Sequence, residues 1–201
     1  MGSPAPQHPM TSDEFLAFEN ASPIKHEYVR GEVFAMTGTS DFHNDVVHNV
    51  SSLLRDHLRG KPCRAHHENI KLRVEAANAY FYPDVFVTCD PRDRDDHLVK
   101  RHPVLIVEVL SESTAEYDRT DKFDDYQLLE SLREYALVDS RQRRAIVYRK
   151  GDDGRWDRAP MSDAASVTLA SIGLTTSIAA LYDDTDVPEF RSARERGAVE
   201  G

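Results

Sequence analysis

Apolar residues recur every three or four positions between residues 41 and 59, which is the spacing of one face of an α-helix. The repeated positions are Val46, Val47, Val50, Leu53, Leu54 and Leu58. Asp41 can cap the start of this helix, and Gly60-Lys61-Pro62 can end it. Shorter helices are predicted over residues 11–20, 118–131 and 177–182.

The other apolar segments have the length and composition of β-strands. Residues 26–36 predict a hairpin that turns at Arg30-Gly31. Residues 104–110 form an apolar run interrupted by one glutamate, which is typical of a central strand covered on both faces. Further strands are predicted over residues 64–74, 80–89, 134–139, 144–149, 155–159 and 166–169, with a polar loop over 90–102. The pattern predicts one α+β domain over residues 11–182, between a flexible extension over residues 1–10 and a polar tail over residues 183–201.

The composition of the 201 residues, with 40% hydrophobic and 30% charged, is that of a globular protein of one domain. No apolar run approaches the roughly 20 residues that cross a bilayer, and no signal-peptide pattern is visible, so we expect a cytoplasmic protein without membrane contact. In that compartment Cys63 and Cys89 are expected as buried thiols rather than as a disulfide. The net charge of −10 argues against a large basic nucleic-acid surface, but it leaves room for a locally basic cleft or for bound metal.

Two carboxylates occupy positions where an unpaired charge would be costly. Asp84 follows Pro83 at the start of an apolar strand, and Glu108 interrupts the most apolar strand of the chain. A buried carboxylate needs a partner, and two of them on neighbouring strands could share one Mg²⁺ or Mn²⁺ ion. Such an ion can activate water as a nucleophile.

A lysine follows on the predicted helix after Glu108. Asp118, Lys122 and Tyr126 are spaced by four residues and therefore share one helix face. If this helix packs on the sheet, Lys122 can orient the attacking water or stabilise charge on a phosphate. The competing interpretation is that Asp118 and Lys122 form an ordinary exposed helix pair.

Other charged groups have weaker patterns. His43 and His48 point in different directions on their helix, and adjacent His66 and His67 face opposite sides of a strand, so neither pair predicts a metal site. Basic residues gather at Lys100, Arg101 and His102 and at Arg141, Arg143, Arg144, Arg149 and Lys150. They could contact a phosphate backbone, although solvated loops are the commoner role. The acidic loop of Asp90, Asp93, Asp95 and Asp96 is expected to remain in solvent.

The ordered set of these motifs is similar to the signature of the Uma-two family of candidate restriction endonucleases, in the PD-(D/E)xK superfamily. The matching residues are Tyr82-Pro83-Asp84-Val85, Val107-Glu108-Val109-Leu110-Ser111 with Ser113-Thr114, then Asp118, Lys122 and Tyr126, together with Glu27, Gly31, Glu32 and His43.

The resemblance spans roughly residues 11–182 and implies a restriction-endonuclease-like fold, a mixed central β-sheet flanked by helices. It also implies Mg²⁺-dependent hydrolysis of DNA, with Asp84 and Glu108 as metal ligands and Lys122 as catalytic lysine. Glu32, His43, Asp118 and Tyr126 are secondary site candidates. The chain departs from the superfamily pattern at Leu110, where the lysine usually stands two residues after the acidic ligand.

Two alternatives stay open beside a DNA nuclease. The chain could be a catalytically silent protein of the same fold that serves as a binding or assembly module, or a hydrolase of another phosphate-containing substrate. A homodimer is expected for cleavage of both DNA strands, because that requires two sites.

Overall fold

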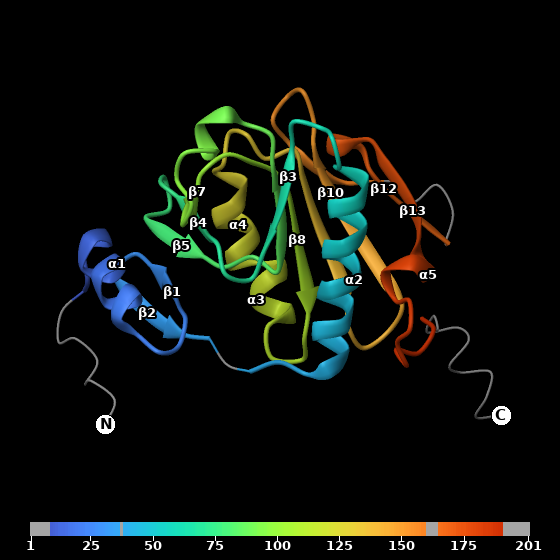
Figure 1. The fold of residues 1–201 in the computed structure, drawn as a ribbon, viewed down its shortest axis with the longest axis horizontal. Helices are drawn as coiled ribbons and strands as arrows, with labels where there is room; N and C mark the ends of the chain where they lie inside the picture. Colours follow the sequence, from blue (N-terminus) through green and yellow to red (C-terminus); the bar gives the residue numbers. More distant parts are fainter. Residues whose placement is uncertain (1–8, 37, 160–164, 191–201) are drawn as a thin grey trace.

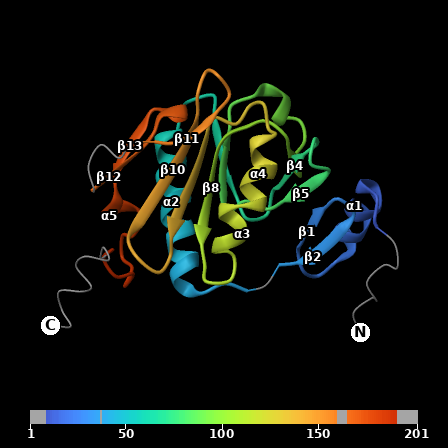
Figure 2. The ribbon, with the colours of Figure 1, turned by 180° about the vertical axis from the view of Figure 1, so that it is seen from behind.

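The apolar run around Glu108 forms the longest strand of the protein and lies inside a six-stranded mixed sheet. We describe the protein from a computed structural model that places residues 9–36, 38–159 and 165–190 (Figures 1 and 2). The strand order is β11-β10-β9-β8-β6-β3, in which only β8 and β9 pair in parallel. These strands are β3 (Arg64–His67), β6 (Val85–Thr88), β8 (Pro103–Leu110), β9 (Glu134–Asp139), β10 (Arg144–Lys150) and β11 (Trp156–Arg158).

A second sheet of five strands has the order β2-β1-β5-β4-β7. Its strands are β1 (His26–Val29), β2 (Glu32–Ala35), β4 (Lys71–Val74), β5 (Ala79–Phe81) and β7 (Val99–Lys100). The segments 64–74 and 80–89 were each predicted as one strand, and that prediction is wrong, because each divides between the two sheets. The first breaks at Glu68, whose φ is +45°, and the second breaks around Pro83, which has no N–H to donate to a ladder. The second break leaves Asp84 at the junction between the sheets.

Helices cover both faces of the six-stranded sheet, as Figures 1 and 2 show for α2 and α4. One face packs against α2 (Asp41–His57), α5 (Ile178–Leu181) and the hairpin of β12 (Ser166–Leu169) and β13 (Leu174–Ser177). The other face packs against α3 (Ala115–Arg119), α4 (Asp121–Gln127) and the five-stranded sheet. Leu105, Val107 and Val109 of β8 face α2, whereas Ile106 and Leu110 face α4. Glu108 alternates with the first set, so its side chain lies on the α4 face.

The predicted α+β architecture is confirmed, and the long amphipathic helix begins at Asp41. The prediction that Asp41 caps this helix is wrong, because the side chain of Ser40 accepts the His43 N–H and is the cap. The short helix α1 (Ser12–Ala21) is also present and carries a capping box between Thr11 and Glu14. The helix predicted over residues 118–131 is shorter and interrupted, because the backbone leaves helical geometry at Thr120 (φ −122°, ψ −98°). Short 3₁₀ turns lie at Pro91–Asp93 and Ala170–Ile172.

The expectation of two free thiols is contradicted, because Cys63 and Cys89 form a disulfide. The sheet register explains this pairing. Arg64 of β3 lies opposite Thr88 of β6, so the cysteines that precede and follow these residues also lie opposite each other, with Cα atoms 4.0 Å apart. This separation is well below the roughly 7 Å beyond which two cysteines cannot be bridged.

Two polar segments are more ordered than their composition suggested. In the 90–102 loop, Asp93 is only 4% exposed and accepts hydrogen bonds from the backbone N–H groups of Arg101 (2.9 Å) and His102 (3.0 Å). In the tail, Val187 is buried in the core, and the Arg143 N–H donates to the Pro188 carbonyl at 2.8 Å. The expectations for residues 1–8 and 191–201 lie outside the described residues.

Within residues 9–36, 38–159 and 165–190, no helix combines the length and apolar character needed to cross a membrane.

Candidate active site

The sheet register brings Asp84 and Glu108 together. β6 runs antiparallel to β8 with Val85 opposite Val107, so Asp84 and Glu108 come to lie across from each other. The Asp84 N–H donates to Glu108 Oε2 at 3.0 Å, and the Val109 N–H donates to Asp84 Oδ2 at 2.7 Å. These reciprocal bonds hold two carboxylates in fixed positions at the end of neighbouring strands.

Lys122 reaches the same carboxylates from helix α4. Its Nζ lies 3.0 Å from Glu108 Oε1, 3.0 Å from Glu27 Oε1 and 3.6 Å from Asp118 Oδ1. The Tyr126 hydroxyl, one turn further along the helix, donates to Glu108 Oε1 at 2.9 Å. The structure therefore places Lys122 as a buried ion-pair residue and not as part of an exposed helix pair.

The usual lysine position of the superfamily has a different role here. Leu110 is buried in the apolar core beneath α4. The ammonium group of Lys122 instead reaches the carboxylate of Glu108 from the helix that packs on that face.

Negative charge exceeds positive charge in this cluster. Burial raises the pKa of Glu108 to about 8; the charge of Lys122 opposes this shift, and Asp84 and Asp118 add to it. Burial likewise raises the pKa of Asp118. For Lys122, the surrounding carboxylates outweigh burial and raise its pKa well above its ordinary value, so the ammonium group stays charged. The cluster thus holds one cation and a surplus of carboxylates that favours either a bound proton or a further cation.

His43 lies beside Asp84, with Nε2 at 3.3 Å from Asp84 Oδ2. Burial alone would lower its pKa, but the hydrogen bond and the charge of Asp84 outweigh burial and raise it above 6.5. Its Nδ1 atom is buried and has no hydrogen-bond partner among the described residues. His48, by contrast, is exposed, as expected for the two divergent directions on α2.

Two glutamates of the β1–β2 hairpin have different locations. Glu32 is exposed on edge strand β2 and does not line the cavity that opens over Asp84 and Glu108. Glu27 of β1 contacts Lys122 and lines that cavity. The sequence indicates Glu27 only as part of the family signature, and no local pattern distinguishes it from Glu32.

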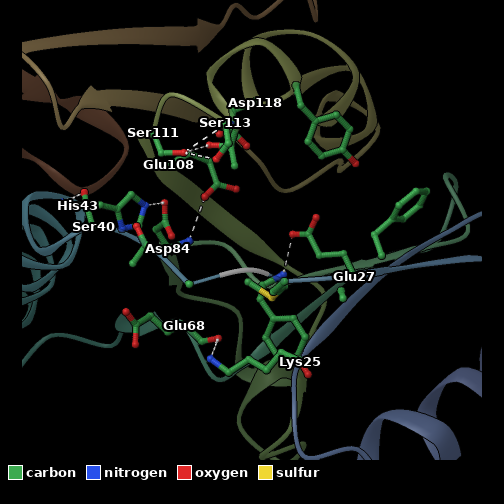
Figure 3. Close-up of a pocket in the computed structure, with 18 of the residues that line it drawn as sticks. Lys25, Glu27, Ser40, His43, Glu68, Asp84, Glu108, Ser111, Ser113 and Asp118 are labelled. Atoms are coloured by element: carbon green, nitrogen blue, oxygen red, sulfur yellow. Dashed lines mark hydrogen bonds and ion pairs between the residues drawn. The ribbon is translucent and has the colours of Figure 1, made fainter. Parts of the chain in front are cut away.

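A cavity of about 1000 Å³ opens over these residues (Figure 3). Figure 3 shows Asp84, Glu108 and Glu27 around this space, with His43 at one side and Lys25 at another. The acidic residues that line it are Glu27, Glu68, Asp84, Glu108, Glu112 and Asp118. The lysines and arginines that line it are Lys25, Lys122 and Arg141. Tyr126 is fully buried below it, and Glu32 lies elsewhere.

Three residues of the two predicted basic groups are used in structural contacts. Arg149 Nη2 lies 2.7 Å from the buried Glu134, and Arg143 binds backbone carbonyls of the tail. Lys100 is 4% exposed and donates to the backbone carbonyls of Asp93 and Asp96. These three side chains therefore stabilise loops and do not form a basic surface.

The donor chemistry at Asp84 and Glu108 fits a hard divalent cation. Mg²⁺ usually takes one or two carboxylates and keeps several of its waters. No group of three His, Cys, Asp or Glu side chains in the described ranges is arranged to hold a metal. An ion here would therefore have two protein carboxylates and water as ligands, and its charge would offset the surplus of buried carboxylates.

The mixed sheet flanked by helices, with an acidic cluster at a strand junction and a lysine from helix α4, defines a restriction-endonuclease-like fold. Residues 12–179 match the model of the Uma2 family, described as "Putative restriction endonuclease", and the chain belongs to this family.

Similar proteins span nearly the same length. An uncharacterized protein of Synechocystis sp., slr1290, is 37% identical over 178 residues, which covers 89% of this chain and 94% of that protein. A second one, sll1609, is 33% identical over 149 residues, with 73% and 84% covered. The crystal structure of a "putative nuclease" from Anabaena variabilis superimposes with a TM-score of 0.69 at 20% identity, covering 86% of this chain and 97% of that one. This similarity confirms the predicted fold class.

Proposed function

We propose that this protein is a metal-dependent nuclease that hydrolyses phosphodiester bonds of DNA. The observation that carries the proposal is the convergence of Asp84, Glu108 and Lys122, from two strands and a helix, at the floor of one cavity. A nuclease needs a cation site and a fixed positive group beside the phosphate, and these residues can supply both. Membership of the Uma2 family supports the same class of reaction.

Each residue has a distinct task in this proposal. Asp84 and Glu108 would hold Mg²⁺ or Mn²⁺, and the bound ion would supply Lewis acidity and lower the pKa of water. Lys122 would place its ammonium group beside the phosphate or the attacking water, where it stabilises developing negative charge. Glu27 and Asp118 keep Lys122 charged and oriented through contacts of 3.0 and 3.6 Å.

The excess of acidic residues in the cavity makes DNA binding dependent on the cation. Six acidic residues line the cavity, against three lysines and arginines. A phosphate would be repelled from such a surface until a divalent ion offsets part of the charge. Cleavage of both strands of a duplex would require two such sites, and a homodimer is part of the proposal for that reason.

One observation favours the alternative of a silent binding module. Both oxygens of Glu108 already accept from protein groups, namely Tyr126, Lys122 and the Asp84 N–H. A carboxylate engaged in this way can serve as a structural ion pair without binding metal.

The deciding experiment compares the native protein with Asp84→Asn, which keeps the shape of the side chain but removes a charged ligand. Mg²⁺ and Mn²⁺ binding is measured by calorimetry, and cleavage of supercoiled plasmid is measured with each metal. We expect the variant to lose at least about tenfold in metal affinity and nearly all cleavage. The matched control is Asp95→Asn, which removes the same charge from an exposed loop position.

Cleavage by Asp84→Asn at the native rate would refute the assigned site. A folded native protein that neither binds these metals nor cuts DNA would make the binding module the better explanation. Circular dichroism of each variant separates loss of function from loss of fold.

A further inference from the structure

Arg141 differs from the other basic side chains of the cavity. Lys122 is surrounded by three carboxylates, and Lys25 donates from Nζ to the Glu68 carbonyl at 3.2 Å. The Arg141 side chain is 48% exposed and lines the same cavity. Of the lysines and arginines that line the cavity within the described ranges, it is the one best placed to receive an anion from solution.

The fold holds Arg141 in place through its neighbour in the chain. Asp139 is the last residue of β9 and is 3% exposed. It accepts hydrogen bonds from the Arg141 N–H at 3.0 Å and from Arg141 Nε at 3.2 Å. Ser140 donates from Oγ to the Leu110 carbonyl at 2.8 Å, which ties this turn to the end of β8. The two side-chain bonds to Asp139 use Nε and Nη2, so the Nη1 donors are not engaged by Asp139.

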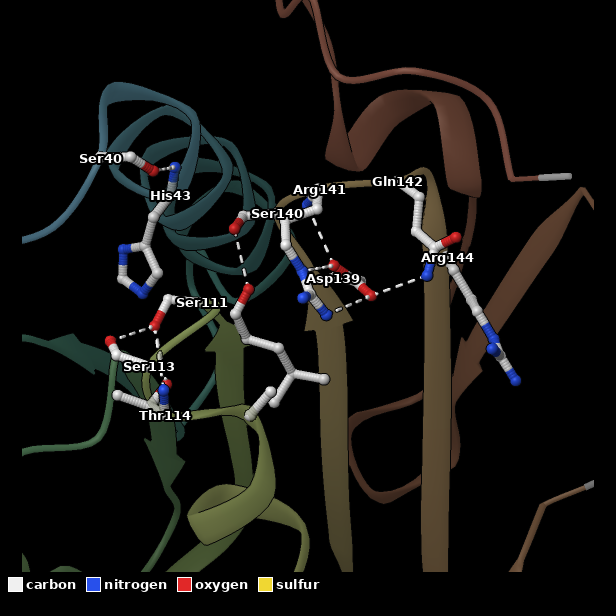
Figure 4. A network of polar contacts seen from close by, with 12 residues as sticks. Ser40, His43, Ser111, Ser113, Thr114, Asp139, Ser140, Arg141, Gln142 and Arg144 are labelled. Carbon is white, nitrogen blue, oxygen red and sulfur yellow. Dashed lines mark hydrogen bonds and ion pairs between the residues drawn. The ribbon is translucent and has the colours of Figure 1, made fainter.

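Three hydroxyl residues follow β8 at the edge of the sheet where Arg141 follows β9 (Figure 4). Ser111 Oγ lies 3.1 Å from Ser113 Oγ and 3.1 Å from Thr114 Oγ1. All three residues follow β8 directly and line the cavity. Guanidinium and hydroxyl groups are the usual donors to phosphate oxygens of nucleic acids.

The strand register gives the spacing between this group and the metal-binding candidates. Leu110 pairs with Asp139 across β8 and β9, and Glu108 lies two residues before Leu110. Two residues of strand correspond to about 7 Å, and the Arg141 guanidinium is held at the Asp139 carboxylate in the turn that follows β9. Arg141 therefore lies further along the strand direction than Glu108, where it can contact the phosphate next to one bound at Glu108.

We propose that Arg141, with the hydroxyls of Ser111, Ser113 and Thr114, forms a subsite for a backbone phosphate next to the one that is cleaved. The ligand class is a nucleic-acid strand of at least two phosphodiester groups. This inference rests on the proposed nuclease function. It extends that function by naming the residues that contact the nucleic-acid strand beyond the carboxylate site.

The test measures binding of a labelled duplex oligonucleotide by fluorescence anisotropy at salt concentrations from about 50 to 200 mM. Ca²⁺ replaces Mg²⁺ because it takes the same oxygen ligands. Native protein is compared with Arg141→Gln, with Arg141→Lys and with the control Arg158→Gln, which removes one charge from an exposed position of β11. Plasmid cleavage with Mg²⁺ is measured for the same four proteins.

A phosphate contact predicts two linked results for Arg141→Gln. Affinity at low salt falls by about tenfold, and the slope of log affinity against log salt becomes less steep by about one. Arg141→Lys retains most of the slope because it keeps the charge, and Arg158→Gln matches the native protein. A merely structural role of Arg141 would lower affinity without changing the slope.

The outcomes separate this inference from the proposed function. Native cleavage with an unchanged salt slope in Arg141→Gln overturns the subsite and leaves the nuclease intact. Native binding without cleavage, with the slope reduced in Arg141→Gln, supports the subsite and overturns the nuclease. A native protein that neither binds nor cleaves the DNA overturns both.

Discussion

Replacement of Lys122 by methionine tests whether the buried cluster is held together by one cation. Lys122 and Glu108 have side chains that are 8% and 2% exposed, and their charged atoms lie 3.0 Å apart. At an effective dielectric constant of about 20, such a pair attracts with about 5–6 kcal/mol when Glu108 is ionised. Desolvation of the ammonium group offsets part of this attraction, and measured losses for breaking a buried pair are about 3–5 kcal/mol.

We therefore expect Lys122→Met to lower the free energy of unfolding by about 3–5 kcal/mol. For a domain of 201 residues this corresponds to a fall in Tm of about 6–20 °C. Urea unfolding followed by circular dichroism gives the free energy, and thermal unfolding gives Tm. Lys61→Met, at an exposed position, is the matched control and should change stability by less than about 0.5 kcal/mol.

A double variant identifies the cause. If unpaired negative charge is responsible, Glu108→Gln in the Lys122→Met background should restore a substantial part of the lost stability. A Tm within about 2 °C of the native value for Lys122→Met, or no restoration by Glu108→Gln, would show that neutralisation of Glu108 by Lys122 does not hold the cluster together.

Two further predictions concern the edge strand β3. Changing Cys63 and Cys89 to serine opens a loop with a sequence separation of 26 residues and should cost about 3–4 kcal/mol in urea unfolding; equal stability of the native protein with and without reductant would contradict this. Burial, with the charge of Lys100, lowers the pKa of His66 to about 4 from 6.5. Because the folded value lies below the unfolded one, this contribution to stability is complete above pH 6.5 and is lost as the pH falls towards 4. The loss should be about 2 kcal/mol after allowance for the partly exposed ring, and His66→Gln should remove it; a variant whose stability falls with acid as steeply as the native protein's would count against it.

Local sequence patterns were sufficient to predict features that do not depend on which other segment an element packs against. The repeat from Val46 to Leu58 predicted α2, because a helix buries one stripe of its surface whatever the partner is. The glutamate at position 108 was identified as a residue in need of a partner, because a charge within an apolar strand is costly in any fold. The ordered motifs around Asp84 and Glu108 also indicated the family correctly.

The register between strands distant in sequence could not be predicted in the same way. Residues 64–74 have one continuous strand pattern, yet they serve two sheets, because periodicity reports which residues are buried and not which strand they pair with. The pairing of Cys63 with Cys89 follows from the register of β3 against β6, and no feature near either cysteine indicates it.

The composition of the candidate site was decided by packing between elements. Glu27 became a partner of Lys122 only because the β1–β2 hairpin joins β5 and helix α4 packs over Glu108. The same packing left Glu32 on an exposed edge strand, and it brought the ammonium group of Lys122 to Glu108, although the superfamily motif places its lysine at the position that Leu110 occupies here. Sequence determines the chemistry that each residue carries, but the position of a charged atom depends on contacts between segments far apart in the chain, which only the tertiary structure sets.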